Sequence, residues 1–238
     1  EKINKSVYGK NMKAFVRDVD ITLWGSGVGD DGVEIVVRGH ETSAGQVYCA
    51  FQEYLKAYKE FGILLNIASK NDHENAVAGL NHPAGVLRPD DFIKIKANWE
   101  PKERTLLQIA EELNLMPDSL VFVDDNPAER EIVRAQVPGA AVPEMPAEPA
   151  HYAKIIDRSG FFEVPGLSED DRRRTAMYQE NDRRMQEQAA FADYEEYLKA
   201  LAMKAEIGPF TAVYMARIAQ LTNKSNQFNL TTRRDSQP

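Results

Sequence analysis

The stretch that decides the fold is FVRDVDITLWG, residues 15–25. A short apolar run ends at Arg17, and Asp18 and Asp20 follow with one valine between them. The run predicts a buried strand, and two carboxylates so close together repel each other unless a cation or a shared proton lies between them. The stretch is therefore either an acidic loop exposed to solvent or part of a metal site.

Composition limits the class of protein. The chain has 238 residues, of which 43% are apolar and 28% are charged, as in ordinary globular proteins. A net charge of −8 argues against general affinity for nucleic acid or anionic membranes. The single cysteine excludes an internal disulfide and a multi-cysteine zinc site, and favours a reducing compartment. Without a membrane-length apolar run or a signal-peptide core, we expect a cytoplasmic protein, whose oligomeric state the sequence leaves open.

The first part of the chain alternates short apolar runs with amphipathic segments of helical length. This alternation predicts an α/β fold with a Rossmann-like parallel sheet flanked by helices. The expected strands are residues 13–16, 63–68 and 120–123, with a weaker fourth at 140–142. The expected helices are residues 45–62, a segment starting near Asp72, and residues 101–113, with Gly62 ending the first.

Two segments depart from this alternation. Residues 25–45 are rich in glycine and predict a hairpin flap over the end of the first strand. After a proline-rich boundary near residue 146 the alternation stops, which predicts a core domain over 1–146 and a mostly helical extension over 147–238. In the extension we expect helices at 168–190 and 193–201, a strand-like segment at 203–208, and a helix ending near Leu221. The gaps between the motifs leave no room for a large cap domain.

Polar side chains follow each main strand of the predicted sheet. Because the carboxyl ends of parallel strands meet at one edge, we expect these side chains to converge there. They are Asp18 and Asp20 after the first strand, Ser69 and Lys70 after the second, Asp124 and Asp125 after the third, and Lys102 at the start of the preceding helix.

The chemistry of this set suits phosphoryl transfer. Magnesium prefers carboxylate oxygens and pairs with substrate phosphates, so Asp18 with Asp124 or Asp125 can bind it, with the Asp20 carbonyl nearby. A carboxylate beside such a cation can attack phosphorus, and a second one can protonate the leaving oxygen and then activate water. Ser69 can donate to a phosphate oxygen, and Lys102 can neutralise the charge of the transferred group.

The order of these features resembles a known superfamily. D-x-D-x-T, a strand-end serine, a helix-start lysine and a strand-end Asp-Asp together resemble the haloacid dehalogenase (HAD) superfamily of phosphotransferases. Across nearly the whole chain, the segments DITLWGSGVGDDGVE, IASKNDHENA, KANWEPK, VFVDDNPAEREIVR and LTNKSNQFNLTTRR resemble the FkbH-like branch of that superfamily.

The resemblance implies an activity, a cofactor and a partner. Members of this branch take D-1,3-bisphosphoglycerate, remove its phosphates, and deliver a glyceryl unit to the phosphopantetheine thiol of an acyl carrier protein in polyketide-type biosynthesis. The implied cofactor is Mg²⁺. The implied catalytic residues are Asp18 as nucleophile, Asp20 as general acid and base, and Lys102. The residues expected to bind substrate or phosphate are Thr22, Ser69, Lys70, Asn71, Arg88 and Asn126, and those expected to bind the metal are Asp18, Asp20, Asp124 and Asp125.

Three positions depart from the usual pattern of this branch. Arg17 replaces an apolar residue, Ile21 replaces a small polar one, and Val19 stands where many relatives have cysteine. The last change removes the site of a covalent glyceryl thioester. Cys49 projects opposite the apolar stripe of its helix, so it is either a reachable thiol or an incidental cysteine. We expect direct transfer to the carrier thiol.

Several alternatives stay open at this point. The protein is either the glyceryl transferase, a simple phosphatase acting on a small metabolite or phosphoprotein, or an inactive carrier-docking module in which Arg17 pairs with the nucleophile. Arg88 either binds a substrate phosphate or forms a structural pair with Asp90 or Asp91. Whether the chain is a part excised from a larger synthase also stays open.

Overall fold

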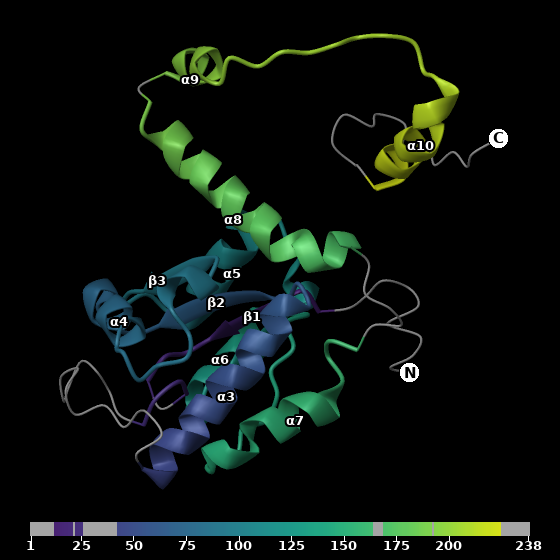
Figure 1. The fold of residues 1–238 in the computed structure, drawn as a ribbon. Coiled ribbons are helices and arrows are strands. Elements are labelled where there is room, and N and C mark those ends of the chain that lie inside the picture. The colour runs from purple at the N-terminus through teal and green to yellow at the C-terminus, as the bar shows by residue number, and fades with distance from the viewer. Residues whose placement is uncertain (1–11, 21, 26–41, 164–168, 192, 225–238) are drawn as a thin grey trace. The chain divides into compact units, whose positions relative to one another are not determined.

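The computed structural model describes residues 12–20, 22–25, 42–163, 169–191 and 193–224 (Figure 1). Most of the predicted flap, residues 26–41, lies outside the described residues. The chain forms two compact units, Glu1–Gln186 and Glu187–Pro238. The residues after 146, up to Gln186, thus group with the core, whereas the sequence suggested a division near 146.

The first unit is built on a four-stranded parallel sheet with strand order β3-β2-β1-β4. The strands are β1 Ala14–Arg17, β2 Leu64–Ser69, β3 Lys94–Ala97 and β4 Leu120–Val123. β1 lies between β2 and β4, with Arg17 opposite Ile67 on one side and Val123 on the other. Every residue of β1, β2 and β4 is buried, as expected for parallel strands covered on both faces. The predicted parallel sheet is confirmed.

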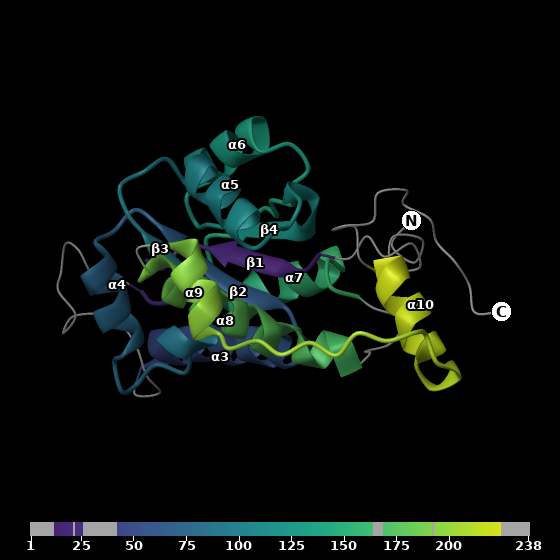
Figure 2. The ribbon, with the colours of Figure 1, turned by 90° about the horizontal axis from the view of Figure 1, so that it is seen from above.

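Helices cover both faces of this sheet, with α3 on one side and α5 and α6 on the other (Figure 2). Their bounds are α3 Ser43–Glu60, α4 His73–Leu80, α5 Lys102–Glu112, α6 Pro127–Gln136 and α7 Tyr152–Ser159. The face toward α3 and α7 packs around Phe15, Leu65 and Val121, and the face toward α5 and α6 around Val16, Leu64 and Phe122. Alternate residues of each strand therefore serve opposite cores, which fixes the strand register.

The sequence pattern did not predict several of the helices and strands. β3, α6 and α7 were not predicted, nor were the short 3-10 helices η1 Pro89–Asp91, η2 Pro117–Ser119, η3 Pro149–His151 and η4 Ala212–Tyr214. The weak fourth strand expected at 140–142 is reduced to an isolated bridge between Ala141 and Val121. The fourth strand of the sheet is β3 instead, at the far edge beside β2.

Helix α3 was predicted over residues 45–62 and runs from Ser43 to Glu60, with a wider buried face than predicted. Thr42 caps its first turn by accepting from the Gly45 amide at 3.0 Å, and Gly62 follows its end with a φ of 78°. Cys49 is 1% exposed, so the expectation that it lies off the buried face is wrong. The reason is tertiary: the loop carrying Ala84 packs on this side, with the thiol 3.8 Å from the Ala84 carbonyl oxygen.

Helix α8, Glu169–Ala189, confirms the long charged helix expected after the boundary. Part of it, up to Gln186, belongs to the first unit and contacts the core there. Arg174 donates to the Gly62 carbonyl at 3.1 Å, and the Thr175 hydroxyl to the Lys59 carbonyl at 3.3 Å. A Cβ added at Gly62 would lie 1.8 Å from the backbone oxygen of Asp171. This turn of the chain therefore requires glycine, both for its positive φ and for contact with α8.

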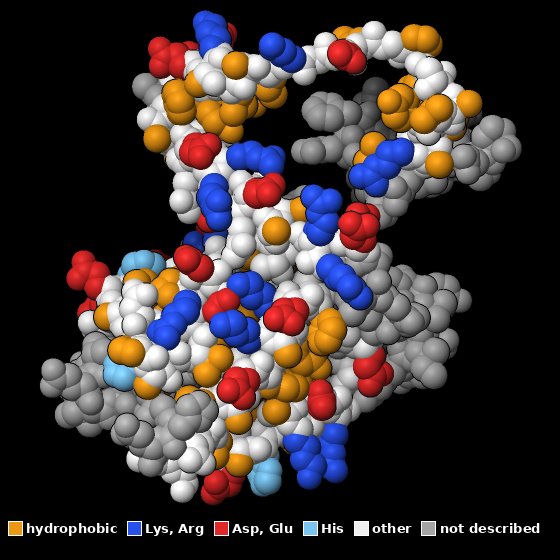
Figure 3. Space-filling view, viewed as in Figure 1, with side chains coloured by type: hydrophobic (Ala, Val, Ile, Leu, Met, Phe, Trp, Pro, Cys, Tyr) orange, Lys and Arg blue, Asp and Glu red, His pale blue; other side chains and the backbone are white. Residues whose placement is uncertain are grey.

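The second unit contains α9 Tyr194–Ala200 and α10 Met215–Lys224. Residues 203–208 form no strand, so that prediction is wrong; all six are exposed and none pairs with a described segment. Ile207 is 97% and Phe210 is 72% exposed, and Figure 3 shows hydrophobic side chains at the surface of this unit. In the described ranges of both units, no helix is long and apolar enough to cross a membrane.

Candidate active site

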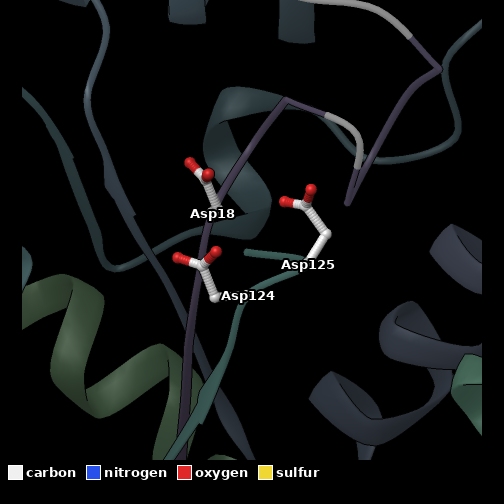
Figure 4. Close-up of side chains that lie close together, drawn as sticks. All are labelled: Asp18, Asp124 and Asp125. Carbon is white, nitrogen blue, oxygen red and sulfur yellow. The ribbon is translucent and has the colours of Figure 1, made fainter. Parts of the chain in front are cut away.

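Three carboxylates meet where β1 and the neighbouring edge strand β4 end. Asp18 directly follows β1, and Asp124 and Asp125 follow β4, its parallel neighbour. The Asp18 amide continues the ladder by donating to the Val123 carbonyl at 3.1 Å, which keeps the two strand ends together. One carboxylate oxygen from each aspartate lies within 4.8 Å of the others (Figure 4). Residues more than a hundred positions apart in sequence thus form one acidic group.

Lys102, the first residue of α5, brings a positive charge into this group. Its ammonium donates to Asp18 Oδ2 at 2.7 Å and to Asp124 Oδ2 at 2.6 Å, and its side chain is 4% exposed. Burial favours the neutral amine, but the two carboxylates outweigh it and raise the pKa of Lys102 above its ordinary value. Lys102 therefore stays charged at neutral pH.

The carboxylates remain electrostatically crowded despite this lysine. Burial, reinforced by the charge of Asp18 and opposed by Lys102, raises the pKa of Asp124 to about 6. Burial and Asp18 also raise the pKa of Asp125. Three carboxylates carry more negative charge than one ammonium neutralises, and carboxylate oxygens in this spacing are the ligands that Mg²⁺ prefers. The donor set fits a divalent cation held by Asp18, Asp124 and Asp125.

An arginine that sequence reasoning missed anchors the two aspartates after β4. Arg130 Nη1 donates to the carbonyls of Asp124, at 3.0 Å, and Asp125, at 2.7 Å. Its Nη2 donates to Glu144 Oε2 at 3.0 Å. The sequence pattern did not predict α6, and Arg130 lies one helical turn after its N-cap Asn126, so this contact could not be foreseen.

Asp20 is held apart from the three-carboxylate group. Its Oδ1 accepts from the Trp24 indole N–H, and its Oδ2 from the Asn71 amide, both at 2.9 Å. Among the described residues, the carboxylates close enough together to share one ion are those of Asp18, Asp124 and Asp125, and Asp20 is not one of them. Its side chain is thus placed differently from that of Asp18, although the two are separated by one residue.

Two buried hydroxyls of the predicted phosphate site have no internal partner. Ser69, the last residue of β2, is 3% exposed, and Thr22 is fully buried. In the described part of the chain neither hydroxyl oxygen has a hydrogen-bond partner. Buried polar groups normally have one, so each of these hydroxyls keeps an unused hydrogen-bonding capacity in the described part of the chain.

Three other predicted ligands have protein partners. Lys70 forms an ion pair with Glu129 of α6 at 2.5 Å, although its side chain is 40% exposed. The side-chain oxygen of Asn126 caps α6 by accepting from the Ala128 amide at 2.9 Å. Arg88 lies in another loop, where its guanidinium donates to the carbonyls of Leu80, His82 and Pro83 at 3.4, 2.5 and 3.1 Å. Asp91 is bound by the Arg88 backbone amide and not by its guanidinium.

Arg17 does not pair with the nucleophile. Its side chain is fully buried, with the guanidinium carbon 5.9 Å from the Phe51 ring centre and 5.5 Å from that of Phe92. Its three nitrogens make no hydrogen bond within the described ranges. Burial lowers the pKa of Arg17 well below its usual value, and the charge of Asp18 opposes this only in part. Asp18 pairs with Lys102 instead.

Among solved structures, the chain is similar to the N-terminal part of protein BF1531 from Bacteroides fragilis, which contains a phosphatase domain complexed with Mg. The two are 39% identical with a TM-score of 0.68, and the match covers 69% of this chain but 44% of the Bacteroides chain. The parallel sheet with its flanking helices is a HAD-like Rossmann fold, and this chain spans less than half of the length of the Bacteroides chain.

More distant structures also match. A HAD-family enzyme, bt-2542 from Bacteroides thetaiotaomicron, complexed with magnesium and inorganic phosphate, is 11% identical over 57% of this chain and 95% of its own, with a TM-score of 0.41. The cobalt-bound deoxy-D-mannose-octulosonate 8-phosphate phosphatase of Haemophilus influenzae is 14% identical over 83% of this chain and 99% of its own, with a TM-score of 0.40. No family model and no curated protein matches the chain.

Proposed function

We propose that this protein is a magnesium-dependent phosphatase of the HAD type that uses Asp18 as its nucleophile. The observation that carries the proposal is the meeting of Asp18, Asp124 and Asp125 with the buried ammonium of Lys102. The partnerless hydroxyls of Ser69 and Thr22 add support, because a phosphate oxygen can accept from both. The similarity to the Mg-bound phosphatase domain of BF1531 agrees with this assignment.

The reaction proceeds in two displacements. A carboxylate oxygen of Asp18 forms a bond to phosphorus while the bond from phosphorus to the leaving oxygen breaks, and the Asp20 carboxyl gives its proton to that oxygen. Water then attacks the aspartyl phosphate, Asp20 takes the proton of the water, and the bond between Asp18 and phosphorus breaks. Lys102 balances the charge of the transferred group. Bound Mg²⁺, held by Asp18, Asp124 and Asp125, would neutralise phosphate charge and orient the substrate.

For the substrate, we propose D-1,3-bisphosphoglycerate, with transfer of the glyceryl unit to the phosphopantetheine thiol of an acyl carrier protein. The support is the resemblance of KANWEPK, DDNPAERE and NQFNLTTRR to the FkbH-like branch. In this reaction the carrier sulfur bonds to the acyl carbon, the bond to the acyl-phosphate oxygen breaks, and phosphate departs with the thiol proton. The remaining phosphate ester is hydrolysed at Asp18. Because Cys49 is the single cysteine and is 1% exposed, transfer goes directly to the carrier.

The test combines the protein with bisphosphoglycerate, Mg²⁺ and a phosphopantetheinylated carrier. Released phosphate is measured, and the carrier mass is read by intact-protein mass spectrometry. We expect phosphate release and a carrier heavier by one glyceryl group. Asp18→Asn should abolish hydrolysis of the phosphate ester and leave a phosphoglyceryl group on the carrier, whereas Asp118→Asn, at an exposed position, should still hydrolyse it. Full activity of Asp18→Asn would remove Asp18 from the nucleophile role.

A simple phosphatase is the second candidate, supported by the similarity to the Mg-bound phosphatase domain of BF1531. Phosphate release without any change in carrier mass would select it. The third candidate, an inactive carrier-docking module, rested on a pair between Arg17 and the nucleophile. That pair is not formed, since the Arg17 guanidinium lies between Phe51 and Phe92. Carrier binding without phosphate release would still be needed to choose this candidate.

A further inference from the structure

The indole of Trp24 is a rigid donor beside the active site. Trp24 is 1% exposed and belongs to the hydrophobic core on the α3 side of the sheet. Its backbone is fixed as well, because the side chain of Gln52 donates to the Leu23 carbonyl at 2.9 Å, and a bridge joins Trp24 to Asp20. A ring locked by packing holds its N–H in one direction, and that N–H points at Asp20 Oδ1.

Asn71 is a second donor whose orientation is also determined. It is 3% exposed, and its Oδ1 accepts from the Asp72 amide at 2.7 Å. That bond turns the Nδ2 group of the amide toward Asp20 Oδ2, at 2.9 Å. The two oxygens of Asp20 are therefore bound by donors from two different segments, the loop after β1 and the end of β2.

We propose that Trp24 and Asn71 are positioning residues that hold the Asp20 carboxylate in the orientation required for proton transfer to and from the phosphoryl group. The inference rests on the proposed function, in which Asp20 is the general acid and base. A proton is transferred efficiently only within about 2.6–3.2 Å, and a misplacement of about 1 Å can reduce the rate roughly a hundredfold. The Asp20 carboxylate lies outside the group of three whose oxygens are within 4.8 Å of one another, and protein donors bind both of its oxygens.

A comparison of two substrates separates this role from a structural one. The value of kcat/KM reports the first displacement, in which the leaving oxygen departs. An alkyl ester such as 3-phosphoglycerate needs a proton on that oxygen, whereas p-nitrophenyl phosphate releases a stable anion and needs none. In Trp24→Phe, which keeps an aromatic ring but lacks the N–H, we expect kcat/KM for the alkyl ester to fall at least about tenfold. For the aryl ester we expect a change of less than about threefold.

Asn71→Ala provides a second variant in case Trp24→Phe does not fold, and the same selective loss is expected. Trp99→Phe is the matched control, because Trp99 is 72% exposed and its indole donates to Asp72 instead, at 3.0 Å. Its ratio between the two esters should equal that of the wild type. An equal loss for both esters in a folded variant would overturn the inference and leave the proposed function intact. A wild-type protein that releases phosphate from neither ester would refute both.

Discussion

Replacing Asp124 by asparagine should stabilise the metal-free protein. The pKa of Asp124 is raised from 3.8 to about 6, because the carboxylate is buried and lies beside Asp18. A shift of about two pKa units at about 1.4 kcal/mol each means that the ionised group costs the folded state roughly 3 kcal/mol. Asparagine has nearly the same shape, keeps an oxygen that can accept from the Asn126 amide, and carries no charge. The net effect of Lys102 is already contained in the shifted pKa.

The sign of the pH dependence follows from the same shift. Because the folded pKa lies above the unfolded one, the folded protein binds a proton more tightly between about pH 4 and about pH 6. The wild-type free energy of unfolding therefore gains this contribution as the pH falls through that window, and lacks it above. The advantage of Asp124→Asn should be roughly 3 kcal/mol well above the folded pKa and should disappear at pH values below the window.

The assay is urea unfolding followed by far-ultraviolet circular dichroism, in EDTA, over a series of pH values. Asp118→Asn, at an exposed position, is the control and should stay within about 0.5 kcal/mol of the wild type. Adding Mg²⁺ at a hundred times its Kd should stabilise the wild type by about 2.7 kcal/mol, and Asp124→Asn by much less. A variant that is less stable than the wild type in EDTA above neutral pH, or a difference independent of pH, would refute the reasoning.

Three further changes test the surroundings of the site. Lys102→Ala leaves its two carboxylate partners buried without a counter-charge and should lower the free energy of unfolding in EDTA by about 3–5 kcal/mol, with a smaller loss in Mg²⁺. Gly62→Ala places a side chain at a positive φ, which costs about 1–2 kcal/mol, and adds a clash with Asp171. Urea unfolding should therefore show a free energy of unfolding lower by more than about 2 kcal/mol. Gly208→Ala, whose added Cβ would have nothing within 4 Å, is the control and should not change the free energy of unfolding. Arg17→Met removes a buried guanidinium and should raise the stability by about 1–3 kcal/mol, measured by thermal unfolding; a loss would mean that the guanidinium has a partner in solution.

The sequence predicted those parts of the site that depend on local order along the chain. A buried strand followed by Asp18, and another followed by Asp124, place both carboxylates at one sheet edge once the strands are parallel. The start of α5 at Lys102 was equally local, because proline precedes it. For these residues the pattern of apolar runs and helix starts was sufficient.

What the sequence did not predict depends on contacts between distant segments. β3 has the sequence KIKA, and its two lysines interrupt the apolar pattern from which a strand is predicted. The strand forms because Glu112 of α5 and Asp182 of α8 pair with these lysines. Cys49 looked reachable because a helical projection cannot include the loop that carries Ala84. The sequence pattern also did not predict that Asn71 donates to Asp20, because Asn71 follows a different strand.

Two buried charged residues, Asp124 and Arg17, lie at the ends of the neighbouring strands β4 and β1, and their burial has different consequences. Burial destabilises the ionised form of Asp124 and so raises its pKa. A divalent cation bound by Asp18, Asp124 and Asp125 would offset this destabilisation, so a raised pKa is the expected property of a metal ligand before the metal binds. Arg17, at the end of the neighbouring strand, has its guanidinium carbon near the rings of Phe51 and Phe92, and its nitrogens have no hydrogen-bond partner in the described ranges. The stability of Asp124→Asn should therefore come with loss of metal binding, whereas that of Arg17→Met should not. A difference in metal binding between the two stabilised variants would therefore distinguish a residue of the metal site from a residue of the core.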